Sequence, residues 1–170
     1  MQAGKDLIGK QIISISDGRQ LGTVKDLYLD SSLNLVVGVY LGAQGLFSRK
    51  SLLIERNNVM VFGVDAILAK HADAVTDSSK AVEWAKWIRR DKLQGWQVAT
   101  AGGTKVGTID DVILDEAMRV IGFRLLRVFV EGPIAERRAV AREAVIEAGN
   151  EDEVMIIDLS KAERQSLGSK

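Results

Sequence analysis

Two pairs of aspartates with the same spacing are the residues of this sequence whose types could do chemistry. Asp26 and Asp30 lie four positions apart, and Asp111 and Asp115 repeat that spacing. Residues four apart on a β-strand project from one side of it, so each pair could act as acid and base or hold a hard cation. The same aspartates could instead accept hydrogen bonds from nearby backbone amides where the chain reverses. The structural role is favoured, because neither pair has a histidine nearby and the sequence contains no calcium-loop motif.

The aspartate pairs lie in two copies of one segment. Residues 22–30, GTVKDLYLD, recur 85 positions later as residues 107–115, GTIDDVILD, with five of nine positions identical. The similarity extends upstream, where residues 7–12 match residues 93–98. A repeat of that period, near the size of a small domain, indicates two copies of one compact unit.

The chain is long enough for two small domains. It has 170 residues, of which 46% are hydrophobic, so each copy can bury a core although it lies near the lower size limit for folding alone. We therefore expect a first domain over residues 1–75, a helical linker over 76–92 and a second domain over 93–170.

Composition removes several classes of function. The sequence has no cysteine, which excludes disulfides, thiolate metal sites and a cysteine nucleophile. Its one histidine, His71, is expected to be a solvated surface residue. The 23 basic and 23 acidic side chains balance, so the chain lacks the basic face that nucleic-acid binding requires.

The sequence also predicts a soluble, cytoplasmic protein. Residues 1–5 lack the pattern of a signal peptide, and the longest nearly apolar run, residues 35–43, is too short to span a bilayer. Peripheral association with a membrane stays open.

Short apolar, β-branched runs separated by turn residues predict antiparallel strands in both copies. Asp17 and Gly18 turn the chain in the first copy, and Gly102 and Gly103 do so in the second. Several short strands with turns between them are typical of a small barrel or sandwich. The predicted fold is mainly β, with two tandem small antiparallel β-barrels joined by a short amphipathic helix and followed by a short C-terminal helix.

The linker helix and the C-terminal helix have their own signals. Asp77 can cap a helix whose apolar residues fall on one face, and its two tryptophans, Trp84 and Trp87, are expected to pack between the barrels. The alternative is an exposed interaction site or a membrane-surface helix. The final helix is expected to begin at Ser160, with Glu163 completing a capping box.

A further apolar pair stands in a glycine-rich hairpin tip. Leu46 and Phe47 follow Gly45 and precede Arg49 and Lys50. The pair could be an exposed contact for a partner or for the other barrel, or it could fold back onto the end of its own barrel.

The first copy carries an ordered set of motifs: residues 7–12 (LIGKQI), the Asp17-Gly18 turn and residues 21–30 (LGTVKDLYLD). This order resembles the PRC-barrel family, and the second copy resembles another member, departing at Trp96 and at residues 99–103. The family includes the cytoplasmic domain of the photosynthetic reaction-centre H subunit and the C-terminal domain of a ribosome maturation factor. The resemblance implies small β-barrels without a family-wide catalytic constellation, in proteins that act as scaffolds for partners or complexes.

Two functions follow as expectations. The first is a non-enzymatic scaffold or adaptor that binds a protein partner, with Leu46, Phe47, Trp84 and Trp87 as candidate partner-binding residues. The alternative is a regulator that binds a small molecule or cation through the aspartate pairs or through a cleft between the barrels. Catalysis ranks third, because no recognisable nucleophile arrangement is present. No cofactor and no nucleic-acid partner are expected, and a homo-oligomer stays open.

Overall fold

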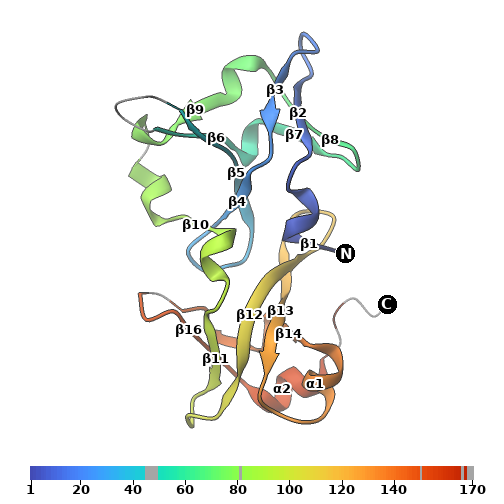
Figure 1. Cartoon of the computed structure of the whole chain (residues 1–170), viewed down its shortest axis with the longest axis vertical. Helices are drawn as coiled ribbons and strands as arrows, with labels where there is room; N and C mark the ends of the chain where they lie inside the picture. The colour runs from blue at the N-terminus through green and yellow to red at the C-terminus, as the bar shows by residue number, and fades with distance from the viewer. Residues whose placement is uncertain (45–49, 81, 150, 166, 168–170) are drawn as a thin grey trace. The chain divides into compact units, whose positions relative to one another are not determined.

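The computed structural model describes residues 1–44, 50–80, 82–149, 151–165 and 167 (Figure 1). The fold is mainly β, as predicted, with three sheets and two short α-helices in the described residues. In that part of the chain each sheet is an open path of strands rather than a ring. Closed barrels are therefore not part of the observed architecture.

The chain forms two compact units, each containing one repeat. The N-terminal unit consists of residues 5–30 and 36–89, and the C-terminal unit consists of residues 1–4, 31–35 and 90–170. The chain therefore passes from one unit to the other four times, after residues 4, 30, 35 and 89. The predicted limits of 1–75 and 93–170 did not include this exchange of segments.

Two sheets make up the N-terminal unit. The first has the strand order β3-β2-β8-β7 and the second β10-β4-β5-β6-β9. The strands of the first sheet are β2 (Gln11–Ser14), β3 (Gln20–Thr23), β7 (Val59–Phe62) and β8 (Ala66–Ala69). Those of the second are β4 (Asp26–Leu29), β5 (Val36–Gln44), β6 (Lys50–Glu55), β9 (Val75–Asp77) and β10 (Ile88–Arg89).

The predicted Asp17-Gly18 turn joins β2 to β3. Gly18 has a φ of 71°, in the left-handed region that glycine enters without a Cβ penalty. Its N–H donates to the carbonyl oxygen of Ser14 at 2.8 Å, and the Asp17 carboxylate accepts from the N–H of Arg19 at 3.1 Å. The turn chemistry expected from the sequence is confirmed.

One larger sheet makes up most of the C-terminal unit. Its order is β14-β13-β12-β11-β16-β15, and β1 also pairs with β12. The strands are β1 (Gln2–Ala3), β11 (Gln97–Thr100), β12 (Lys105–Leu114), β13 (Val120–Val128), β14 (Ala139–Ala141), β15 (Val145–Glu147) and β16 (Val154–Ile157). Strand β12 corresponds to β3 and β4 of the first repeat, but it is continuous. The second repeat therefore forms one sheet where the first repeat forms two.

The core of each unit is built from equivalent positions of the two repeats. In every pair of equivalent positions both side chains are buried: Ile12 and Val98, Val24 and Ile109, Leu27 and Val112, Leu29 and Leu114, Val39 and Phe123, Ile54 and Val140, and Ile67 and Met155. The repeated sequence is therefore largely a repeated core.

The predicted linker helix is wrong in type. Among its described residues the segment forms two 3₁₀ turns, Ser78–Lys80 and Val82–Lys86, and no α-helix. It begins after β9, which pairs with β6, and ends at β10, which pairs with β4. Both ends of the segment are thus held by strand pairing at opposite edges of one sheet, and these tertiary contacts override its local helical preference. We call residues 78–87 the strap.

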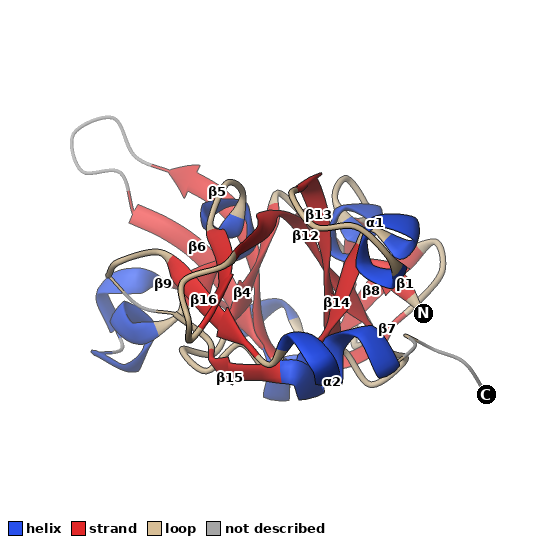
Figure 2. Ribbon diagram, turned by 90° about the horizontal axis from the view of Figure 1, so that it is seen from below, coloured by secondary structure: helices blue, strands red, loops and turns tan. Residues whose placement is uncertain are grey.

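The two α-helices belong to the C-terminal unit. The predicted C-terminal helix is confirmed as α2 (Leu159–Arg164), but Asp158 rather than Ser160 caps it, accepting from the N–H of Lys161 at 3.0 Å. The other helix, α1 (Pro133–Arg137), was not predicted from the sequence. Its five residues are too few to show a helical period. Helix α1 contacts α2 and β14. Figure 2 labels all three elements in the view from below.

Candidate functional site

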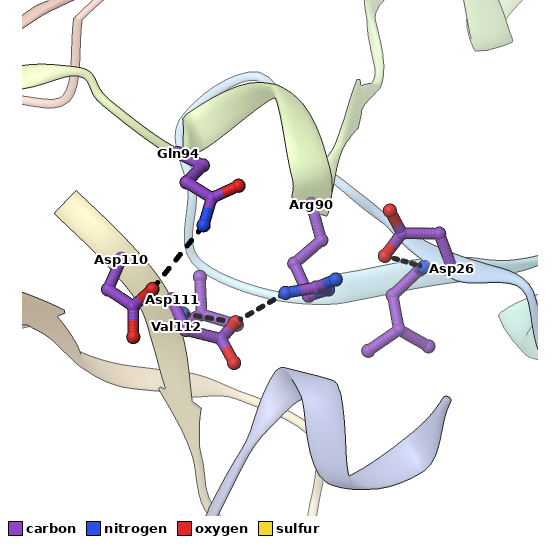
Figure 3. Close-up of polar contacts among 7 residues, drawn as sticks. Asp26, Arg90, Gln94, Asp110, Asp111 and Val112 are labelled. Carbon is purple, nitrogen blue, oxygen red and sulfur yellow. Dashed lines mark hydrogen bonds and ion pairs between the residues drawn. The ribbon is translucent and has the colours of Figure 1, made fainter. Parts of the chain in front are cut away.

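The first aspartate of each pair is buried and holds its own strand. Asp26 and Asp111 occupy equivalent positions, and each carboxylate accepts a hydrogen bond from the next backbone N–H, of Leu27 or Val112, at 2.8 Å (Figure 3). A carboxylate used in this way stabilises the local backbone, as aspartates do where a strand is irregular.

Asp111 also forms an ion pair with Arg90 inside the C-terminal unit. Its Oδ1 lies 2.9 Å from Arg90 Nη1, and the two side chains are 1% and 15% exposed (Figure 3). Gly4 makes room for this pair, because a Cβ at that position would lie 2.5 Å from Arg90 Cδ and 2.9 Å from Asp111 Oδ1. Gln94 adds a long contact to the neighbouring Asp110, at 3.5 Å.

The second aspartate of the C-terminal pair organises a turn. Asp115 accepts from the backbone N–H groups of Ala117 and Arg119 and from Arg119 Nε, each at 2.9 Å. Burial by itself would raise the pKa of Asp115, but the hydrogen bonds from Arg119 and Ala117 and the Arg119 charge outweigh it and hold the pKa below the ordinary 3.8. Asp30, at the equivalent position, is partly exposed after β4.

These contacts favour a structural role for the aspartates. In the second pair both carboxylates already face an arginine, which a cation would have to displace. In the part of the chain that the structure describes, no three His, Cys, Asp or Glu side chains come together in a way that could hold a metal ion. The arrangement therefore offers hydrogen-bond acceptors to the backbone rather than an acid and base to a substrate.

Both strap tryptophans lie against the second sheet of the N-terminal unit. Trp84 is buried, and its Nε1 donates to Glu55 Oε1 at 2.9 Å. Trp87 is partly exposed, with its ring centroid 6.0 Å from that of Trp84 and 6.1 Å from that of Tyr28. Gly38 permits this approach, because a Cβ there would lie 3.2 Å from Trp87 Cζ3. Trp84 is thus a packing residue of this unit, and a role of Trp87 in partner binding stays a prediction.

The aromatic cluster continues onto the neighbouring strands. Tyr28 and Tyr40 meet edge to face with centroids 5.8 Å apart, and the Arg89 guanidinium lies 4.9 Å from the Tyr40 ring centroid. Burial, and then the neighbouring Tyr40, raise the pKa of Tyr28 above 10.0. The contact between Trp87 and Tyr28 holds the strap on its sheet, and the cation–π contact joins β10, which follows the strap, to Tyr40 of β5.

Sequence reasoning missed a pocket in the C-terminal unit. It has a volume of about 350 Å³ and is lined by Gln97, Val98, Lys105, Gly107, Thr108 and Phe129. Phe129 is 55% exposed although it is a large apolar side chain. The Oγ1 atom of Thr108 is buried and has no hydrogen-bond partner among the described residues. The sequence contains one signal of this pocket, the large apolar residue Phe129 directly after β13. The alternation of side chains along a strand does not show on which face of the sheet a residue just beyond the strand lies.

The family model for the PRC-barrel domain matches residues 1–75 and 88–161. The chain belongs to the PRC-barrel family. Two matched segments fit the tandem repeat found in the sequence. No curated protein matches the chain.

Each PRC-barrel segment begins with a short strand that pairs with a strand of the other segment. Strand β1 opens the first match, and its Gln2 and Ala3 pair with Leu114 and Ile113 of β12. Strand β10 opens the second match, and its Ile88 and Arg89 pair with Leu29 and Tyr28 of β4. Leu29 and Leu114 are equivalent, so the two repeats exchange their first strands in the same register.

Three residues singled out in the sequence of this PRC-barrel protein remain, Leu46, Phe47 and His71. Leu46 and Phe47 lie outside the described residues. His71 is exposed, as predicted. None of the described helices has the length and hydrophobicity that crossing a bilayer requires.

Proposed function

We propose that this PRC-barrel protein is a non-enzymatic adaptor, built as two tandem barrel-like units, that binds a protein partner through the C-terminal unit. The groups that could do chemistry support this proposal by their engagement in the fold: Asp26 and Asp111 cap strand amides, and Asp115 organises a turn. Family membership adds support, because it is associated with interaction domains. Fold alone does not define an activity, so a surface must carry the proposal.

The pocket beside Phe129 is the observation that carries it. Its volume of about 350 Å³ is near the lower limit for pockets that hold small molecules, and it is large enough to admit a large apolar side chain from a partner. An exposed aromatic residue at the edge of a pocket is the kind of residue that contributes most to binding energy at protein interfaces. Val98 and Gly107 provide further apolar surface.

The charge at the pocket defines the partner further. Lys105 is exposed at the pocket, and no acidic residue is among the described residues that line it. The expected partner segment therefore has an apolar anchor followed or preceded by an acidic side chain.

The proposal is tested by cross-linking capture from native lysate with the full chain. Phe129→Ser removes the aromatic edge of the pocket. Ile146→Ser is the matched control, because Ile146 is in the same unit and is 61% exposed, against 55% for Phe129. A partner recovered by the wild type and by Ile146→Ser but lost from Phe129→Ser supports the adaptor. Identical sets of cross-linked proteins from all three chains would refute it.

The alternative of a cation- or ligand-binding regulator that uses the aspartates or a cleft between the repeats stays a prediction. For a cation to bind Asp111 it would have to displace Arg90, which lies 2.9 Å away. We expect no change in the melting temperature when Ca²⁺ is added. A Ca²⁺-dependent rise in the melting temperature that disappears in Asp111→Asn would favour the regulator instead.

A further inference from the structure

The last part of strand β13 has an open edge on the side of β14. Strand β14 pairs with β13 at Gly122, Phe123 and Arg124, and among the described residues no strand pairs with β13 beyond Arg124 on that side. Strand β13 itself continues to Val128, where it still pairs with β12. It therefore has one strand neighbour at its end and two at its beginning. We call residues 126–128 the open edge.

The backbone of Val128 faces away from β12. The N–H of the next residue, Phe129, donates to the carbonyl oxygen of Val106, on the β12 side, at 2.8 Å. In an antiparallel ladder the backbone groups of successive residues point alternately to the two sides of the strand. Val128 therefore directs one hydrogen-bond donor and one acceptor toward the open edge.

The first repeat shows what lies beside this edge of the fold. Strands β5 and β6 are the equivalents of β13 and β14, and β6 pairs with β5 as far as Gln44, which lies opposite Lys50. Counting from the equivalent pair Val39 and Phe123, the residue that corresponds to Gln44 is Val128. An antiparallel strand is thus the neighbour that this edge has in the other copy of the fold.

The second repeat lacks that neighbour because α1 takes the place of the start of β6. Helix α1 ends at Arg137, Arg138 has a left-handed φ of 53°, and the chain joins the sheet only at Ala139. The Arg138 side chain then donates from Nη2 to the carbonyl oxygen of Leu126 at 2.5 Å. A side chain takes the place of a strand at Leu126, and within the described part of the chain no such contact reaches Val128.

The open edge is accessible and long enough for strand pairing. The side chains of Leu126 and Phe129 are 49% and 55% exposed, and Arg127 is exposed between them. Pairing over two residues already occurs in this protein, because β1 and β10 each add to a neighbouring strand through two residues.

The bulge at the start of the open edge is no obstacle to an added strand. Leu126 has no partner in β12, but the pairing with β12 is regular beyond it. Bulges can end strand pairing. In the first repeat, however, the pairing of β5 with β6 has a register shift between Tyr40 and Gly42 and continues on both sides of it.

We propose that an extended segment of the protein partner adds to the open edge as an antiparallel strand. This inference rests on the proposed function, because the segment is taken to belong to the partner that contacts Phe129. In such β-augmentation the backbone groups of Val128 pair with the segment, and alternate side chains of the segment face the same side. Leu126 and Phe129 suit apolar side chains, and the exposed Arg127 suits acidic ones.

A second copy of the chain is a poorer occupant than a partner segment. Arg127 lies in the open edge, and Arg138 lies beside it and is also exposed. Two open edges that met each other would bring these cations together, which is how natural edge strands avoid pairing with themselves.

The probe for the proposal is a set of peptides that the full chain selects from a phage-displayed random library. We expect the selected peptides to alternate apolar and acidic residues. On binding, amide hydrogen exchange at Val128 should slow by about tenfold or more. Exchange at Phe129 should be slow with and without peptide, because that N–H already donates to Val106.

The decisive variant is Val128→Pro, which removes the N–H that points to the segment. Proline is tolerated in an edge strand whose N–H faces solvent, and the preceding Arg127 is already in a strand, as a residue before proline prefers. The matched control is Val128→Ile, which keeps the N–H and the β-branched side chain. Measured by fluorescence polarisation, the dissociation constant of the peptides should rise by about tenfold or more in Val128→Pro and by less than about threefold in Val128→Ile.

Each outcome decides the proposal. Binding that is lost in Val128→Pro and kept in Val128→Ile, with slower exchange at Val128, supports strand addition. Binding that survives Val128→Pro but is lost in Phe129→Ser refutes strand addition and leaves the adaptor function standing. Peptides that bind all three variants equally refute both proposals for this site.

Three other results are also decisive. A library that yields no binding peptide refutes strand addition, and the adaptor function is then judged by the cross-linking capture. If sedimentation shows a dimer that Val128→Pro dissociates, the occupant is a second copy and the proposal is wrong. If Val128→Pro does not fold, the wild-type exchange decides, because unchanged exchange at Val128 in the peptide complex contradicts strand addition.

Discussion

The buried ion pair between Arg90 and Asp111 should contribute much more to stability than the exposed pair between Arg119 and Asp115. Both pairs have a donor–acceptor distance of 2.9 Å, but the side chains are 15% and 1% exposed in the first and 69% and 25% exposed in the second. Arg90→Gln and Arg119→Gln are matched perturbations, since each replaces a guanidinium by an amide and leaves its carboxylate in place.

The magnitudes follow from burial. Removing one partner of a buried pair typically costs about 3–5 kcal/mol, because the remaining charge stays in a poorly solvated site. Arg90 is slightly open to solvent, so we expect the lower end, about 3 kcal/mol, for Arg90→Gln. An exposed pair contributes about 0–1 kcal/mol, which sets the expectation for Arg119→Gln.

Urea unfolding measures the difference within the C-terminal unit. Trp96 is the one tryptophan of that unit among the three in the chain, so a background with Trp84→Phe and Trp87→Phe makes fluorescence specific to it. With a slope of about 2 kcal/mol/M, the midpoint should fall by about 1.5 M for Arg90→Gln and by less than about 0.5 M for Arg119→Gln.

A double-mutant cycle separates the pair from its surroundings. Combining Arg90→Gln with Asp111→Asn removes both charges, so part of the lost stability should return relative to the sum of the single changes. Equal midpoint shifts for the two arginine variants would refute the reasoning, because burial would then make no difference to the pair.

Three further predictions concern single residues. Folding lowers the pKa of Asp115 below 3.8, so its carboxylate stabilises the fold above that pH. This contribution to the free energy of unfolding is lost as the pH falls through the folded pKa. The free energy of unfolding of Asp115→Asn should therefore decline less than that of the wild type between about pH 5 and 2. Gly107→Ala would place a Cβ against a carbonyl oxygen of β13 and should cost about 1–3 kcal/mol in urea unfolding, whereas Gly102→Ala, with its nearest neighbour atom at 3.9 Å, should change stability by less than about 0.5 kcal/mol. In Tyr40→Phe, Tyr28 is the remaining tyrosine, and its phenolate absorbance should appear with a midpoint above pH 10.0; a midpoint at or below that value would contradict its burial.

The sequence was sufficient to predict the repeated parts of the fold. Buried aliphatic residues recur at equivalent positions, such as Leu29 and Leu114, and the Asp17-Gly18 turn has the conformation that its residues favour. These features depend on neighbours close in the sequence or on a pattern seen twice, so one chain is enough to find them.

The features that depend on distant partners could not be predicted. Arg90 is 21 positions from Asp111, and the first repeat has Gly4 rather than an arginine at the equivalent position, so the repeat gives no hint of this ion pair. The strap has a helical pattern of apolar residues, but strand pairing at both of its ends decides its conformation. Tertiary contacts override local preference in such short segments.

The exchange of first strands also changes what a single repeat is. The opening strand of the first repeat, β1, pairs with β12 of the second, and the opening strand of the second, β10, pairs with β4 of the first. The edge of β4 or β12 is therefore paired only when another repeat supplies the strand. In separate molecules that supply would depend on concentration, whereas here both strands are tethered in one chain at a high effective concentration. Duplication in one polypeptide therefore makes the completeness of each sheet independent of dilution, and cleavage within the strap would restore that dependence.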